Sequence, residues 1–200
     1  GHTIGFVGAS DDHSGRPGYS GGSMLVLSNN STWVDTGLTS IGVGWSPGVD
    51  HWVGKMFMDG SAYIGQSMAI GSVGWPYVGG RTAKLDVNNS TLTLSNGLWI
   101  YGHNYLSATN ALILRSGTIN LGGGANAGFI TNYSIMRAAG TIRGMGNSPA
   151  TLYVGPGGMG TGAWFEVGTS IGTLTLSNVN LTLDAGSVSR WEFNSSGLDQ

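Results

Sequence analysis

Apolar and polar residues alternate with a period of two in several short segments of the chain. Segments 91–95 and 173–177 both read Thr-Leu-Thr-Leu-Ser, and segment 180–183 reads Asn-Leu-Thr-Leu. In an extended strand this alternation places all the leucines of a segment on one side and the hydroxyl or amide side chains on the other. The pattern therefore predicts β-strands with one buried face.

Similar units recur about thirty residues apart. Segment 55–63 aligns residue by residue with segment 84–92, and segments 24–33 and 112–119 follow the same plan. Each unit has a short apolar strand, then a corner made of Asn, Asp, Gly or Ser, then a second strand. An internal period of this length indicates an array of like units, each of which buries its apolar face against its neighbours.

A third strand in each unit carries an isoleucine motif. Ile41-Gly42 is answered by Ile70-Gly71, a looser copy begins at Ile100, and Ile4 starts an earlier copy. We expect the isoleucine to be buried in the core. We also expect a variable loop rich in Gly, Pro and Trp to leave each unit after this strand, so that the loops gather on one side of the array.

Three short strands and three corners in about thirty residues predict an all-β fold, the parallel β-helix or β-solenoid. We expect one domain over residues 1–200, with clear repeats in 24–121, irregular coils in 122–172 and C-terminal coils in 173–197. Coils stacked about 4.8 Å apart would make a continuous core. The alternative is an antiparallel sandwich, which uses similar strands but does not predict self-similar units.

Composition narrows the classes of partner. Glycine accounts for 37 of 200 residues, only 9% of residues are charged, and the net charge is −2. Scarce Lys and Glu disfavour long surface helices, and no basic stripe along the sequence favours a nucleic acid partner. No run of about 18 apolar residues predicts a membrane-spanning helix. The absence of cysteine excludes disulfides and thiolate metal sites.

The short coils resemble a known group of proteins. Their form, LxV followed by NNSTLTLSNG and LWIYG, is similar to the repeats of bacterial autotransporter (type V secretion) passengers and of PEP-CTERM-associated surface proteins. Residues 24–121 carry the resemblance best, and segment 172–200 resembles the C-terminal portion of such passengers. The resemblance implies a right-handed β-helix that is exported to the bacterial cell surface or beyond, and it implies no catalytic residues.

Candidate chemistry is sparse. Asp11, Asp12 and His13 form the best candidate metal site, although a Gly-rich loop with acids is also ordinary turn chemistry. The carboxylates do not cluster as the calcium ligands or acid/base pair of a polysaccharide lyase or hydrolase would. Asp86 alternates with apolar neighbours, so we expect it to point outward as a solvated carboxylate. We expect no catalytic residue, no cofactor and no enzymatic activity.

Aromatic residues concentrate in the loops that follow the isoleucine strands. Trp45 and Trp75 hold matching places in successive units, Trp52 and Tyr77 lie in the same two loops, and His103 lies in the next loop. A row of exposed aromatic side chains can stack on sugar rings or bury against a partner. The alternative role is to shield the edge of their own coil. These five residues are the candidate binding or assembly site.

Paired asparagines occupy matching corners of the units. Residues 29–30 and 88–89 are both Asn-Asn, and each pair also begins an Asn-x-Ser/Thr sequon. Asparagine tolerates the left-handed backbone that a tight corner needs. We expect the stacked corners to form a hydrogen-bonded ladder along the array, in preference to sites of glycosylation.

Together these features predict an extracellular structural protein, a β-solenoid rod that acts as a component of a filament, sheath or adhesin. The alternative is a carbohydrate-binding adhesin that uses the Trp-rich loop face, and a polysaccharide lyase or hydrolase is the third candidate. Neither end of the sequence shows a capping helix. We therefore expect head-to-tail or lateral self-association, with surface glycans as further partners.

Overall fold

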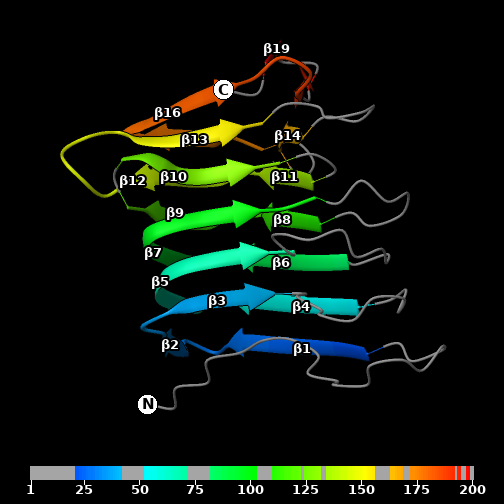
Figure 1. Ribbon diagram of the computed structural model, residues 1–200, viewed down its shortest axis with the longest axis vertical. Coiled ribbons are helices and arrows are strands. Elements are labelled where there is room, and N and C mark those ends of the chain that lie inside the picture. Colours follow the sequence, from blue (N-terminus) through cyan, green and yellow to red (C-terminus); the bar gives the residue numbers. More distant parts are fainter. Residues whose placement is uncertain are drawn as a thin grey trace.

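The fold is described by a computed structural model. It describes residues 21–41, 52–71, 82–102, 110–122, 124–131, 134–155, 163–168, 172–191, 193–194 and 197–198. All regular elements in these residues are β-strands, and Figure 1 shows them stacked along the long axis of the molecule. The predicted all-β fold is confirmed for this part of the chain, which contains no helix able to span a membrane.

The strands follow one another in chain order with bounds that set the coils. They are β1 (Gly21–Ser28), β2 (Thr32–Val34), β3 (Leu38–Ile41), β4 (Trp52–Asp59), β5 (Ala62–Ile70), β6 (Thr82–Asn88), β7 (Ser90–Ile100), β8 (Asn110–Leu114), β9 (Gly117–Leu121), β10 (Gly124–Ile130), β11 (Ser134–Ala138), β12 (Gly140–Gly144), β13 (Ala150–Val154), β14 (Trp164–Val167), β15 (Leu174–Ser177), β16 (Val179–Leu183), β17 (Val188–Trp191), β18 (Phe193–Asn194) and β19 (Gly197–Leu198).

These strands form three faces that run along the stack. Face 1 consists of β1, β4, β6, β8, β11, β14 and β17, paired in that order. Face 2 contains β2, the first halves of β5 and β7, β9, β12 and β15, while face 3 contains β3, the second halves of β5 and β7, β10, β13 and β16. All pairings within the three faces are parallel, and only the short β18–β19 pair is antiparallel.

One passage of the chain over the three faces is a coil, and the described strands form six coils followed by β17. The predicted alignment of units is confirmed, because Lys55 pairs with Lys84 and Tyr63 pairs with Leu92. The length of a coil is not constant. Between partners on face 1 it is 31 residues in the first coil (25 to 56) and 24 residues in the fourth (112 to 136).

Rows of in-register apolar side chains fill the interior. The isoleucine row of face 3 confirms the expected burial of the motif residue, since Ile41, Ile70 and Ile100 pair consecutively and are fully buried. Strand neighbours lie about 4.8 Å apart, so each side chain covers the next one and the core is continuous. Comparable buried rows are Tyr63, Leu92, Ile119 and Ile142 on face 2, and Met56, Leu85, Leu112, Met136 and Phe165 on face 1.

The corners contain the expected asparagines and a hydrogen-bonded ladder. The ladder joins three coils, because Asn88 Nδ2 donates to Asp59 Oδ1 at 2.9 Å and Ser116 Oγ donates to Asn88 Oδ1 at 3.0 Å. It therefore mixes Asp, Asn and Ser rather than using Asn alone. The non-glycine residues with positive φ in the described chain are all asparagines, namely Asn29, Asn30, Asn89 and Asn178.

The irregular section 122–172 keeps the register of the coils before it wherever it is described. Met136 of β11 pairs with Leu112 on one side and Phe165 on the other, and β12 lies between β9 and β15. The strand β10 contains a shift in register between Gly124 and Gly128. Glycine-rich connections obscure this register in the sequence, but the buried rows preserve it in space.

Candidate functional site

The sequence-predicted site residues fall almost entirely outside the described residues. Trp52 begins β4, where its backbone pairs with Gly21. Among the residues that the structure describes, no three His, Asp or Glu side chains come close enough to share a metal ion. The candidates outside the described residues are Asp11, Asp12, His13, Trp45, Trp75, Tyr77 and His103.

Three aromatic side chains form an outward row on face 3, which we call the aromatic ladder. Trp99, Phe129 and Tyr153 come from β7, β10 and β13 and are paired in register. Each directly precedes a fully buried aliphatic residue of the isoleucine row, so strand alternation turns the aromatic side chain outward. The Phe129 and Tyr153 ring centroids lie 5.5 Å apart with the planes tilted by 54°. All three side chains are partly exposed.

A carboxylate fixes one end of the aromatic ladder. Tyr153 Oη donates a hydrogen bond to Asp184 Oδ2, and the backbone N–H of Ala185 donates to Asp184 Oδ1 at 2.8 Å. The hydrogen bond to Asp184 raises the pKa of Tyr153, and the same bond lowers the pKa of Asp184. The ring is thus held in one orientation, beside an ionised oxygen that can accept hydrogen bonds from a ligand.

Further polar groups stand next to the aromatic ladder in the following outward row. This row contains Tyr101 and Thr131, whose backbone N–H groups bond the carbonyl oxygens of Ile70 and Ile100, both at 2.9 Å. Burial raises the pKa of the Tyr101 hydroxyl. Flat apolar rings flanked by hydroxyl and carboxylate groups fit the surface of a sugar, which has an apolar face of C–H groups and a rim of hydroxyls.

On face 1 a buried carboxylate corrects one expectation from the sequence. Asp86 lies on an outward row, but its side chain is only 8% exposed because Lys84 and Arg115 cover it. Lys84 Nζ lies 3.0 Å from Asp86 Oδ2 and also 5.6 Å from the centroid of the Phe57 ring. Burial alone raises the pKa of Asp86, but the hydrogen bonds from Arg115 and Lys84 outweigh it, so the pKa is lowered. The prediction of a solvated carboxylate is wrong.

A second acid occupies the same outward row of face 1 further along the stack. Arg137 Nε donates to Glu166 Oε2, and Arg190 Nη1 lies 3.9 Å from Glu166 Oε1. Glu166 Oε1 is buried and accepts no hydrogen bond from the described residues. Both acids of this row therefore lie beneath basic side chains, but Glu166 is less completely satisfied than Asp86.

A polar cluster is enclosed in the interior of the first coils. Thr39 Oγ1 donates to Asp35 Oδ2, and Tyr63 Oη hydrogen-bonds to both residues. Burial raises the pKa of Tyr63 to about 12, while the hydrogen bond from Thr39 is the main cause of the lowered pKa of Asp35. All three side chains are buried. Their arrangement suits a structural lock between coils, because no substrate has access to it.

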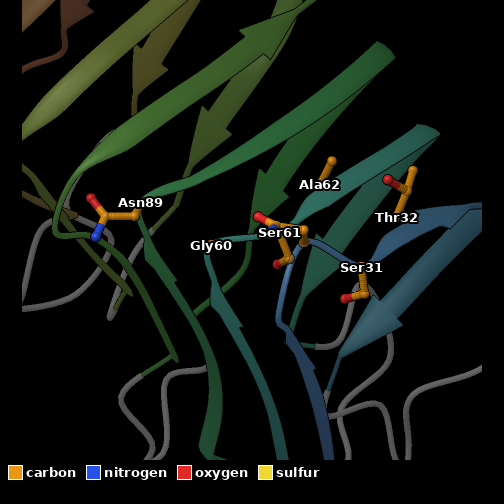
Figure 2. Close-up of a pocket in the computed structure, with 7 residues that line it drawn as sticks. Ser31, Thr32, Gly60, Ser61, Ala62 and Asn89 are labelled. Carbon is orange, nitrogen blue, oxygen red and sulfur yellow. The ribbon is translucent and has the colours of Figure 1, made fainter.

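The corner between faces 1 and 2 contains a shallow depression of roughly 290 Å³, shown in Figure 2. Serine hydroxyls of successive coils line it, and Ser61 Oγ lies 3.4 Å from Ser90 Oγ in the coil above. None of the lining side chains is ionisable, so we assign no catalytic chemistry to it. The lining residues are Asn30, Ser31, Thr32, Gly60, Ser61, Ala62 and Asn89.

Comparison with known proteins adds no identification. No family model, no curated protein and no solved structure matched this chain. The aromatic ladder and the charged rows of face 1 are therefore interpreted from their own geometry. The sequence contains a signal for the ladder, since each of its aromatic residues stands immediately before the aliphatic residue of the third strand.

Proposed function

We propose that this chain is a right-handed parallel β-helix that serves as a structural rod at the bacterial cell surface or outside the cell. The observation that supports it is the unbroken register of buried rows through six coils. Crossovers between parallel strands of one sheet are right-handed in nearly all proteins, which favours this handedness. The resemblance of residues 24–121 to passengers of autotransporters favours export.

The distribution of side chains also favours a structural role over a catalytic one. Inward positions are used for the core, and many outward polar groups bond the neighbouring coil, as Asn120 Nδ2 does with Thr93 Oγ1 at 3.1 Å. The described acids are either paired with bases, bonded to a tyrosine or a corner amide, or enclosed. Repetition of this kind supplies length and surface, with each coil contacting mainly its neighbours.

Two measurements test the rod and its location. Small-angle scattering of the purified chain should report an elongated particle, and electron microscopy at high protein concentration should show filaments or lateral arrays. In the source bacterium, protease added to intact cells should digest the protein. A protein that stays protected until the cells are lysed would contradict the surface location, and a compact spherical particle would contradict the rod.

A second candidate is a carbohydrate-binding adhesin, and the aromatic ladder favours it. Trp99, Phe129 and Tyr153 present one ring per coil, so the rings repeat about every 4.8 Å along the stack. An extended neutral polysaccharide could lie across them, with its hydroxyls near Asp184. This site lies on the strands of face 3, whereas the sequence pointed to the loops that follow them.

Retention on insoluble neutral glycans tests the adhesin. Wild-type protein should be retained by at least one of cellulose, chitin and an insoluble β-glucan, and Trp99→Ala should abolish that retention. Trp164→Ala, which removes a partly exposed tryptophan from face 1, is the matched control and should bind as the wild type does. Equal loss in both variants, or no retention of the wild type, would reject this candidate.

A further inference from the structure

The fold gathers basic residues that are scattered along the sequence. Face 1 presents five of the chain's eight Lys and Arg residues on its outward side, against three acids. The described charges of this face thus sum to +2, although the whole chain carries −2. The bases are Lys55, Lys84, Arg115, Arg137 and Arg190, and the acids are Asp59, Asp86 and Glu166.

The two signs of charge lie at different depths on face 1. The carboxylates of Asp86 and Glu166 are 8% and 9% exposed, whereas Arg115 is 47%, Arg137 is 44% and Arg190 is 63% exposed. The buried acids hold the arginines by one edge of the guanidinium. A ligand that approaches face 1 therefore meets mainly positive charge, already fixed in position by the pairs beneath it.

The bases are spaced along the stack rather than concentrated at one point. β4, β6, β11 and β17 each contain one, and Arg115 directly follows β8, so the row extends over five strand spacings or about 24 Å. Apolar side chains lie between them. Ile113 pairs with both Asp86 and Arg137, and the partly exposed Trp164 stands two residues before Glu166.

We propose that face 1 binds an acidic polysaccharide, a sugar chain bearing carboxylate or sulfate groups, laid along the axis of the stack. Charge complementarity supports this occupant, and the apolar side chains between the bases match the C–H faces of sugar rings. One base per coil also suits a polymer with about one charge per sugar better than duplex DNA, which carries one charge per roughly 1.7 Å. This inference goes beyond the structural role and does not depend on it.

Binding to defined polyanions tests the proposal. The probes are polygalacturonate for carboxylates, dextran sulfate for sulfates and neutral dextran as the uncharged control. Titration calorimetry at low salt should show saturable binding to at least one acidic polymer and none to dextran. Affinity should fall as salt rises, because binding releases counterions from the polymer.

The variant that tests the site is the double substitution Lys55→Gln with Arg190→Gln, which leaves the Asp86–Arg115 and Arg137–Glu166 pairs intact. It should weaken binding about tenfold and reduce the salt slope by about 1.4, for two charges at about 0.7 each. Arg143→Gln is the matched control, because Arg143 is exposed on face 2. Thermal unfolding should confirm that both proteins remain folded.

Three results would overturn the proposal. The first is no saturable binding of the wild type to either acidic polymer at low salt. The second is an equal loss of affinity in Arg143→Gln and in the face 1 double variant. The third is tighter binding to a single-stranded oligonucleotide of equal charge than to either polysaccharide, which would assign the face to nucleic acid instead.

Discussion

Arg115 grips the carboxylate of Asp86 with two hydrogen bonds, from Nε to Oδ1 at 2.8 Å and from Nη2 to Oδ2 at 2.9 Å. The two residues belong to successive coils, and Asp86 is in register with Ile113 rather than with Arg115. The guanidinium therefore reaches back diagonally across the strand pair. Such a bidentate contact is strong and directional, so it fixes the register of β6 against β8 as well as joining the two strands.

Asp86→Asn should destabilise the protein by about 1–3 kcal/mol, because a buried charged hydrogen-bond partner of Arg115 and Lys84 is lost. Glu166→Gln should cost less, since Arg137 donates to only one oxygen of Glu166 and the other oxygen accepts no hydrogen bond from the described residues. Urea unfolding of the two variants and the wild type measures the difference. A larger loss for Glu166→Gln would show that the contact with Arg190 at 3.9 Å has been undervalued.

Acid should weaken the fold through the same carboxylate. The pKa of Asp86 is lowered below its ordinary value of 3.8, so the native state binds the proton less readily than the unfolded state does. The stabilisation is then complete above about pH 4 and is lost as pH falls through the native pKa. Asp35, whose pKa is lowered chiefly by the hydrogen bond from Thr39, acts in the same direction.

Melting temperatures measured between about pH 6 and pH 2 check this prediction, and the wild type should show a decline in the acid range. Asp86→Asn should start lower and decline less steeply, because it lacks one of the two responsible carboxylates. Parallel curves for the two proteins would mean that Asp86 is not a source of the acid sensitivity.

Alkali should act through Tyr63. Burial raises its pKa to about 12, from an ordinary value of 10.0, so the neutral phenol is favoured in the folded state. Its contribution to stability is complete below pH 10 and is lost as pH rises toward 12. Ultraviolet titration should show one tyrosine ionising well after exposed tyrosines, and Tyr63→Phe should remove that late step. Persistence of the late step in Tyr63→Phe would assign it to another tyrosine.

Two corner glycines should respond differently to alanine. Gly117 has φ +105, and a Cβ there would lie 2.2 Å from the carbonyl oxygen of Ser90 in the preceding coil. Gly117→Ala should therefore cost more than about 3 kcal/mol, from backbone strain and a forced separation of two coils. Gly60 has φ +57, and a Cβ there would meet no atom within 4 Å, so Gly60→Ala should cost about 1 kcal/mol.

Denaturant unfolding of both glycine variants provides the comparison, with Gly60→Ala as the control for left-handed backbone alone. Equal losses would indicate that the close approach of Gly117 to Ser90 has no energetic consequence beyond its φ angle.

Period-two alternation and self-similarity were sufficient to predict the strands, the pairing of Lys55 with Lys84 and the buried row of Ile41, Ile70 and Ile100. These features depend on local sequence and on a repeat close to thirty residues. The burial of Asp86 could not be predicted, because it depends on Arg115 from the next coil.

The aromatic ladder and the basic residues of face 1 were missed for a related reason. Trp99, Phe129 and Tyr153 are different residue types separated by unequal numbers of positions, 30 and then 24. Arg137 and Arg190 likewise belong to coils of different length. Which residues share an outward row is therefore visible only after the strands have been paired.

The central claim is that the coils stack in register along one axis, and spin-label distances test it most directly. The chain has no cysteine, so labels can be placed at Thr32 and Thr175, which end the face 2 row through Ala62, Thr91, Thr118 and Thr141. Five strand spacings predict a distance of about 24 Å, and labels at Ala62 and Thr175 should give about 19 Å, one spacing less. Two narrow distributions that differ by about one spacing would support the stack. Equal distances, or a longer one for the Ala62 pair, would contradict it.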